Sequence, residues 1–188
     1  REHLESGSVR INRAKASGTY PANFQLIAAA NPCPCGYLGD PDRRCRCSND
    51  QIERYQARLS GPLLDRIDLF CRVERLDART LLEQGDHGEA SAIVAARVAQ
   101  AQACAQQRQN ALNARAQGDT LANEHCSDAA KHTLTLAADK FQLSGRSVHR
   151  ALRVARTIAD LADAKMIEKN HMLEALSYRQ INFNRGPF

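Results

Sequence analysis

The sequence has no long apolar run, and this absence excludes membrane-spanning proteins. None of its 188 residues belongs to an apolar stretch that approaches the ~20 residues needed to cross a bilayer. The first residues, Arg1-Glu-His-Leu-Glu5, do not resemble a secretory signal peptide. We therefore expect a cytoplasmic protein without a membrane partner.

A large excess of charge of one sign is also missing. The net charge is +5, which permits a nucleic-acid or nucleotide partner without requiring one. Hydrophobic residues make up 43% of the chain, enough to bury at least one core. The composition is that of an ordinary globular protein with one or two domains.

The cysteines do not suit a disulfide framework, because their number, seven, is odd and the sequence shows no export signal. Four of them form two close pairs, Cys33-Pro-Cys35 and Cys45-Arg-Cys47. Four thiolates suit tetrahedral zinc, although each pair has one spacer residue where the common knuckle has two. The loop around them has no core of its own. We predict a closed, structural zinc site here, in preference to free thiols or a redox site.

A basic β-hairpin is predicted near the start of the chain. Residues 8–13 alternate between apolar and polar, as an exposed strand does, and Gly18 indicates a turn within residues 14–19. A charged edge strand and a phosphate-contacting tip explain the basic residues equally well. The outward side chains include Arg10, Arg13 and Lys15.

Two further segments have the length and composition of strands. Residues 24–30 are apolar and stop at Asn31, which predicts a buried strand that carries a polar side chain at its end. A second strand is expected over residues 67–73, directly after Arg66. Each polar residue also has a simpler explanation, since Asn31 precedes a proline as turn residues do and Arg66 could pair with Asp68.

One helix is predicted in the first half of the chain, and the residues from Glu89 onward are predicted to be wholly helical. Apolar spacing and capping residues indicate helices over residues 51–59, 90–116, 127–141, 144–164 and 169–178. Gly85, Asp86 and Gly88 indicate a linker between the two halves. We therefore expect domains at residues 1–75 and 89–188, joined by a linker at 76–88, with the second domain a small helical bundle.

The helix expected from Ser144 begins with basic residues, at the end where a helix already carries partial positive charge. Its acidic residues, Asp160 and Asp163, come later in the same helix. This order costs stability unless an anion binds at the start, so we interpret it as a phosphate site, with a solvated basic face as the alternative. The basic residues are Arg146, Arg150 and Arg153.

Three stretches together resemble one protein family, the magnesium-chelatase-like AAA+ ATPases of the YifB/ComM family. The resemblance covers nearly the whole chain and implies an α+β, partly α/β, fold. It consists of the C-terminal strands of an AAA+ core, with a β-hairpin insertion and the cysteine loop, followed by an all-α lid. The stretches are Phe24-Gln-Leu-Ile-Ala-Ala-Ala-Asn-Pro-Cys-Pro-Cys-Gly36, Ser60-Gly-Pro-Leu-Leu-Asp-Arg-Ile-Asp-Leu69 and Arg150-Ala-Leu-Arg-Val-Ala-Arg-Thr-Ile-Ala-Asp-Leu161.

The resemblance also implies roles for single residues. Asn31 matches sensor 1, which positions the attacking water, and Arg66 matches the arginine finger offered to a neighbouring subunit. Arg146 matches sensor 2 in the lid, with Arg150 one turn further along the same helix. The hairpin over residues 9–20 matches an insertion whose basic tip points into the pore of a hexameric ring. The ComM type is implied to be a DNA helicase that acts in branch migration during natural transformation.

One departure from the family is plain in the sequence. It contains no Gly-x-x-x-x-Gly-Lys-Ser/Thr loop and no apolar run ending in Asp-Glu, so both Walker motifs are missing. We therefore expect the C-terminal part of a longer protein that binds ATP and Mg²⁺, and we expect this part alone to be inactive. Two other functions stay open: a metal-inserting chelatase subunit, which shares the fold, and a stand-alone zinc-binding adaptor.

Overall fold

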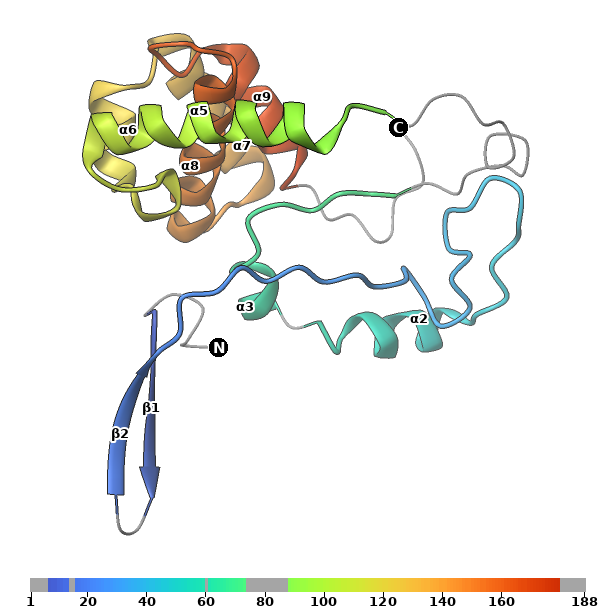
Figure 1. The fold of residues 1–188 in the computed structure, drawn as a ribbon. Helices are drawn as coiled ribbons and strands as arrows, with labels where there is room; N and C mark the ends of the chain where they lie inside the picture. The colour runs from blue at the N-terminus through green and yellow to red at the C-terminus, as the bar shows by residue number, and fades with distance from the viewer. Residues whose placement is uncertain (1–6, 14–15, 60, 74–87, 180–188) are drawn as a thin grey trace. The chain divides into compact units, whose positions relative to one another are not determined.

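The computed structural model of the protein describes residues 7–13, 16–59, 61–73 and 88–179. These residues are mostly helical, with one short β-hairpin (Figure 1). The chain forms two compact units, residues 1–67 with 182–188 and residues 68–181. Most of the predicted linker, residues 76–87, lies outside the described residues. No helix in the described ranges is both long and apolar enough to cross a membrane.

The predicted hairpin is confirmed. Strand β1 (Ser8–Arg13) pairs antiparallel with β2 (Ala16–Pro21), from Ser8 opposite Pro21 to Arg13 opposite Ala16. Gly18 was expected in the turn, but it lies inside β2 opposite Ile11, because pairing continues up to Arg13. A side chain at position 18 would crowd the ring of Tyr20, whose nearest atom would stand 3.1 Å from the added Cβ.

The two other predicted strands are wrong for the described structure. Residues 24–30 have no strand partner and are exposed, with Phe24 58% and Ile27 84% accessible. Residues 67–73 form no strand either, and Val73 is 90% accessible. A strand needs a neighbour to bond its N–H and C=O groups. Among the described residues the strands are β1 and β2, which pair with each other.

Helix α2 (Asn49–Gln56) confirms the helix predicted over residues 51–59, with an earlier start. Ser48 and Gln51 form a capping box: the Ser48 hydroxyl accepts the Gln51 N–H at 3.3 Å, and the Gln51 side chain accepts the Ser48 N–H at 3.0 Å. Ile52 is the buried residue of this helix. The short helix α3 (Gly61–Leu64) follows and ends just before Arg66.

The helical unit contains the longer helices (Figure 1). The helices predicted over residues 127–141, 144–164 and 169–178 are confirmed. The helix predicted over residues 90–116 ends at Gln109, because Asn110 adopts a left-handed φ of 51°. The short helix α6 was not predicted. The elements are α5 (Ser91–Gln109), the 3₁₀ helix η1 (Asn113–Arg115), α6 (Gly118–Glu124), α7 (Asp128–Phe141), α8 (Gly145–Leu161) and α9 (Lys169–Ser177).

Helix α8 lies at the centre of this unit, where it packs against α5, η1, α6 and α9. Its inner face is made of small and branched residues, with Ala151, Leu152 and Ala155 almost completely buried. Alanine side chains allow neighbouring helices to approach closely, so several helices can share this one face. The core is completed by apolar residues of the other helices, including Leu121, Leu134 and Met172.

A buried ionic network lies at the far end of α8. Asp160 is 6% accessible and Arg156, one turn earlier, is fully buried. The Asp160 carboxylate accepts two hydrogen bonds of 2.8 Å from Arg108 of α5, one of 2.7 Å from Asn113 of η1, and lies 3.0 Å from Arg156. The order of charges along this helix suggested that Asp160 is an exposed acidic residue. Asp160 is instead a buried member of an ionic network.

The network also governs the protonation of Asp160. Burial by itself raises the pKa of a carboxyl group, but hydrogen bonds from Arg108 and Asn113 and the charges of Arg156 and Arg108 outweigh it. The pKa of Asp160 is therefore lowered from its ordinary value. The ionised carboxylate is the form that holds α5 and η1 against α8.

We predict that Asp160→Ala lowers the free energy of unfolding by about 3–5 kcal/mol, because the buried Arg156 would keep its charge without a counter-charge. Urea unfolding followed by circular dichroism measures this. Asp139→Asn, at an exposed position of α7, is the matched control and should stay near the wild type. Equal stability of the two variants would contradict the importance of the network.

The wild type and Asp160→Ala should also differ in how their stability depends on pH. A carboxyl whose pKa is lowered in the folded state stabilises the fold above its unfolded pKa, about 3.9, and loses this effect as pH falls through the folded value. Wild-type stability should therefore fall more steeply below about pH 4 than that of Asp160→Ala. Parallel pH profiles for the two proteins would be inconsistent with the lowered pKa.

Candidate functional site

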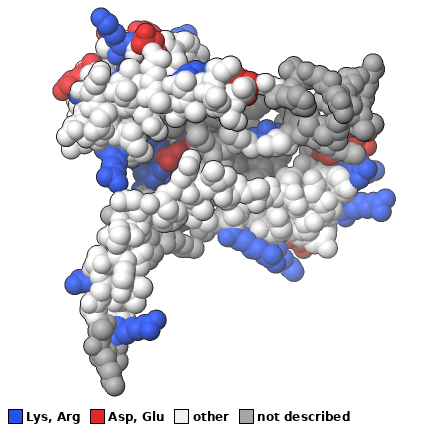
Figure 2. Space-filling model, viewed as in Figure 1, with Lys and Arg blue, Asp and Glu red and all other residues white. Residues whose placement is uncertain are grey.

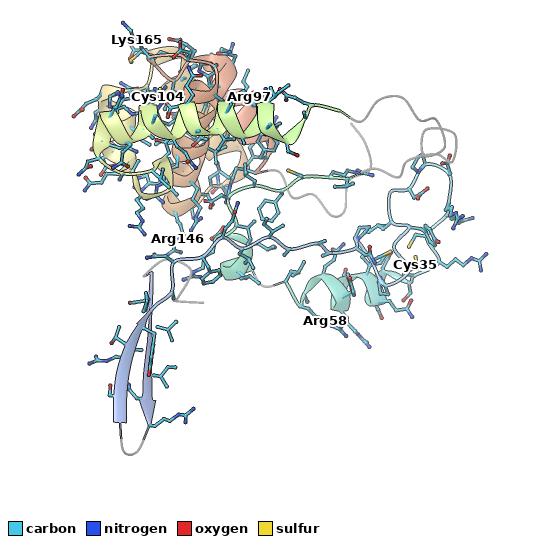
Figure 3. All side chains as sticks on the ribbon, viewed as in Figure 1. Cys35, Arg58, Arg97, Cys104, Arg146 and Lys165 are labelled. Carbon is cyan, nitrogen blue, oxygen red and sulfur yellow. The ribbon has the colours of Figure 1, made fainter. Side chains whose placement is uncertain are left out.

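The four paired cysteines lie together in the first unit, where Figure 3 labels Cys35. All their sulfur atoms are within 4.8 Å of one another, and the sulfur of Cys33 is 3.4 Å from that of Cys35 and 3.6 Å from that of Cys45. Cys35 and Cys45 are 3.5 Å apart. Four sulfurs about 2.3 Å from a tetrahedral zinc ion stand about 3.8 Å from each other. The donor set, completed by Cys47, thus fits a metal such as zinc.

The first cysteine pair is fixed by a tight turn and by α2. The N–H of Gly36 donates to the carbonyl of Cys33 at 3.0 Å, and Gly36 has a φ of +83°, which favours glycine. The side chain of Gln56 in α2 donates to the carbonyl of Pro32 at 3.0 Å. The turn at residues 33–36 therefore places the side chains of Cys33 and Cys35 side by side.

The loop between the two pairs is ordered by polar contacts. The carboxylate of Asp40 accepts the N–H groups of Asp42 and Arg43, each at 2.9 Å. The guanidinium of Arg43 donates to the hydroxyl of Tyr37 at 2.8 Å and lies 5.3 Å from the centre of its ring. Local hydrogen bonds therefore order this loop, whereas apolar packing orders the helical unit. The polar composition of the loop predicts this difference.

The thiols differ in how easily they lose a proton. Hydrogen bonds from the backbone of Tyr37, then of Arg46, lower the pKa of Cys35 to about 6. The backbone of Cys47 acts in the same direction on Cys45, but burial and hydrogen bonds with neighbouring thiols outweigh it and raise its pKa to about 12. A bound cation supplies the positive charge that lets several adjacent thiols ionise together.

Asn31 and Arg66 belong to the same compact unit. Asn31 is exposed, and its carboxamide carbon would stand 3.8 Å from a Cβ added at Gly36, so it borders the first cysteine turn. Arg66 is half-buried in the turn after α3, where its N–H donates to the carbonyl of Leu63 at 2.9 Å. The catalytic roles predicted for both residues stay predictions.

Arg146 and Arg150 belong to the helical unit, at the start of α8. The hydroxyl of Ser144 caps this helix by accepting the N–H of Ser147 at 3.2 Å. Arg146 is exposed (Figure 3), whereas Arg150 is buried and forms an ion pair with Asp68. Local spacing carries no signal for this pair, because Asp68 and Arg150 are 82 positions apart. Phosphate binding by Arg146 and Arg150 stays a prediction.

The basic residues predicted on the hairpin are described in part. Arg10 and Arg13 are exposed, and basic atoms stand out from the hairpin in the space-filling view (Figure 2). Because side chains alternate along a strand, Arg10 and Arg13 lie on opposite faces of the ribbon. Lys15 lies outside the described residues.

Two family models match this chain. Residues 1–81 match the model described as magnesium chelatase, subunit ChlI, and residues 88–179 match its C-terminal counterpart. The chain belongs to the magnesium chelatase ChlI-like family. This confirms the family that the three sequence stretches indicated.

Relatives within the family align along nearly all of this chain. A YifB protein of Salmonella typhimurium is 43% identical over 186 residues, covering 97% of the chain and 36% of the relative. The competence protein ComM of Haemophilus influenzae is 42% identical over 181 residues, covering 95% and 35%. A YifB protein of Escherichia coli is 40% identical over 185 residues, covering 97% and 36%. The chain spans about a third of the length of these relatives.

We predict that the purified protein holds one zinc ion per chain, because four sulfurs converge at nearly tetrahedral spacing. Elemental analysis after purification without added metal measures the content. Cys45→Ser should lose the ion, whereas Cys71→Ser, at an exposed cysteine outside the cluster, should keep it. A metal-free wild type with four titratable thiols would contradict the site.

Proposed function

We propose that this chain provides the sensor, arginine finger and lid of an AAA+ ATPase that works on DNA as a hexameric motor. The observation that carries the proposal is 42% identity to the competence protein ComM along 95% of the chain. Competence is the capacity to take up DNA, which supports a role on DNA. The activity we propose is a helicase that drives branch migration during DNA uptake and recombination. ATP and Mg²⁺ are the cofactors of the full-length protein.

In this proposal, the chain has three parts. Residues 1–75 complete the AAA+ core, residues 76–88 form the linker and residues 89–188 form the lid. The exposed apolar segment over residues 24–30 supports this arrangement, since apolar side chains such as Ile27 gain by burial against further strands of a core. Asn31 follows this segment directly.

In this proposal, three residues have different roles in the hydrolysis of the γ-phosphate. Asn31 orients the attacking water through its carboxamide, which can both donate and accept hydrogen bonds. Arg66 reaches the nucleotide of a neighbouring subunit and stabilises the charge that develops in the transition state. Arg146, which is exposed at the start of α8, senses the phosphates from the lid.

The zinc ion in this proposal is structural. Cys33 and Cys35 follow Asn31 almost directly, so an ordered cysteine loop also fixes the backbone on the C-terminal side of Asn31. Four thiolates leave no open coordination position for a substrate. The metal therefore contributes to the folding of the loop and to the placement of Asn31.

The hairpin is the proposed DNA contact. Arg10 and Arg13 lie on opposite faces of a narrow ribbon, so either face can contact the phosphates of a strand that passes through a pore. The neighbouring residues add no acidic group, since Arg10 and Arg13 are the charged residues of β1 and β2. Contacts with phosphates do not depend on the base sequence. A motor that moves along DNA needs contacts of this kind.

A second candidate function is favoured by the description of the family itself, which names a subunit of magnesium chelatase. In that case the ATPase would drive metal insertion and DNA would not be its partner. The two candidates share Asn31 and Arg66, so they differ in what stimulates hydrolysis. Steady-state ATPase assays of the full-length protein with and without DNA separate them.

We predict that Arg66→Ala in the full-length protein lowers kcat for ATP hydrolysis by roughly 10³-fold, because the transition-state charge loses its cation. Nucleotide binding, measured with a fluorescent ATP analogue, should be nearly unchanged. Mixing this variant with subunits whose Walker loop is defective should restore activity at mixed interfaces. Wild-type turnover in Arg66→Ala would refute the proposed finger.

We predict that replacing Arg10 and Arg13 by alanine weakens DNA binding and lowers the slope of log affinity against log salt by about 2, about 1 for each phosphate contact. Fluorescence anisotropy with labelled DNA at several salt concentrations measures both. The control replaces Arg54 and Arg58, two exposed arginines of the α2 region. Equal loss in both double variants would argue against a hairpin contact.

A further inference from the structure

Two contacts hold the segment after Arg66 against the helical unit. The carboxylate of Asp68 forms an ion pair with the guanidinium of Arg150 in α8. The N–H of Phe70 donates to the carbonyl of Tyr178, directly after α9, at 2.9 Å. The boundary between the two compact units falls between residues 67 and 68, so Asp68 is the first residue of the helical unit.

The two partners of the ion pair differ in burial. The side chain of Arg150 is 9% accessible, whereas that of Asp68 is 54% accessible. Arg150 precedes Ala151 and Leu152 of the core, so its backbone is held by the packing of α8. A buried cation strongly favours a nearby carboxylate, so Asp68 is held by a buried residue of α8.

We infer that Asp68 is a positioning residue for Arg66. The inference rests on the proposed role of Arg66 as the arginine finger. Only Ile67 separates the two residues, and a fully extended chain advances at most about 3.6 Å per residue. The Cα of Arg66 therefore cannot lie more than about 7 Å from that of a residue that the helical unit holds.

This arrangement couples two events in the ring. Arg146, the proposed phosphate sensor, and Arg150, the anchor of Asp68, lie on the same helix, α8. A movement of α8 in response to the nucleotide of its own subunit is therefore transmitted through Asp68 to Arg66, which serves the neighbouring subunit. The ion pair sets how precisely the finger is placed, without touching the nucleotide.

The test uses full-length protein with four variants: Asp68→Asn, Asp68→Glu, Arg66→Ala and the double variant of Asp68→Asn with Arg66→Ala. Asp68→Asn should lower kcat by roughly 10-fold to 100-fold, because small misplacements of a reacting group have effects of this size. The KM for ATP should be unchanged. Asp68→Glu, which keeps the carboxylate, should recover part of kcat.

The double variant tests whether Asp68 acts through Arg66. If it does, the double variant should be no slower than Arg66→Ala, since the finger that Asp68 positions is already absent. Glu89→Gln is the matched control: Glu89 also pairs with an arginine of the helical unit, Arg97, at 2.9 Å. This control should keep wild-type kcat.

Hydrogen exchange supplies a readout that does not depend on catalysis. The amide of Phe70 should be protected in the wild type and lose protection in Asp68→Asn but not in Glu89→Gln. Unchanged protection of Phe70 in Asp68→Asn would overturn the inference, even if kcat fell.

The kinetic outcomes separate the inference from the proposed function. Wild-type kcat in Asp68→Asn, together with an inactive Arg66→Ala, would overturn the inference and leave the finger in place. Independent, multiplying losses in the double variant would also overturn it. Wild-type kcat in Arg66→Ala would remove the proposed finger and the inference with it.

Discussion

The buried carboxylate of Asp160 is the interaction on which the helical unit depends most. It neutralises Arg156, which is fully buried, and binds Arg108 and Asn113 from two other elements. Without this carboxylate, the buried guanidinium of Arg156 in α8 would have no counter-charge. Because α8 also carries Arg146 and Arg150 at its beginning, the same helix links the stability of the unit to its proposed nucleotide-sensing end.

The first unit has a different basis for order. Its cysteine loop is held by turns, a capped helix, backbone hydrogen bonds to the Asp40 carboxylate and one from the Gln56 side chain, with little apolar packing. Such a loop gains from a metal ion, since the coordination bonds replace a missing core. The neighbouring apolar segment over residues 24–30 is exposed, with Ile27 84% accessible. Both features fit a chain that spans about a third of the length of its relatives.

Local signals in the sequence predicted much of this structure. Alternation predicted β1, and Ser144 marked the start of α8 because its hydroxyl caps a backbone N–H group of the first turn. The close spacing of the cysteines predicted their convergence, since a loop of this length can bring two pairs together without help from distant residues. The motifs around Asn31 and Arg66 are enough to indicate the family.

The sequence by itself therefore determined the hairpin, most helices, the cysteine cluster and the family, because each depends on residues close together in the chain. Only the tertiary structure decided what depends on distant partners. Residues 24–30 have the pattern of a strand, yet a strand forms only beside another. Asp160 and Asp68 have the pattern of surface charges, yet one is buried among Arg108 and Asn113 and the other pairs with Arg150. Periodicity and spacing carry no information about which side chain meets which across 47, 52 or 82 positions, because that choice is made by the packing of helices around α8.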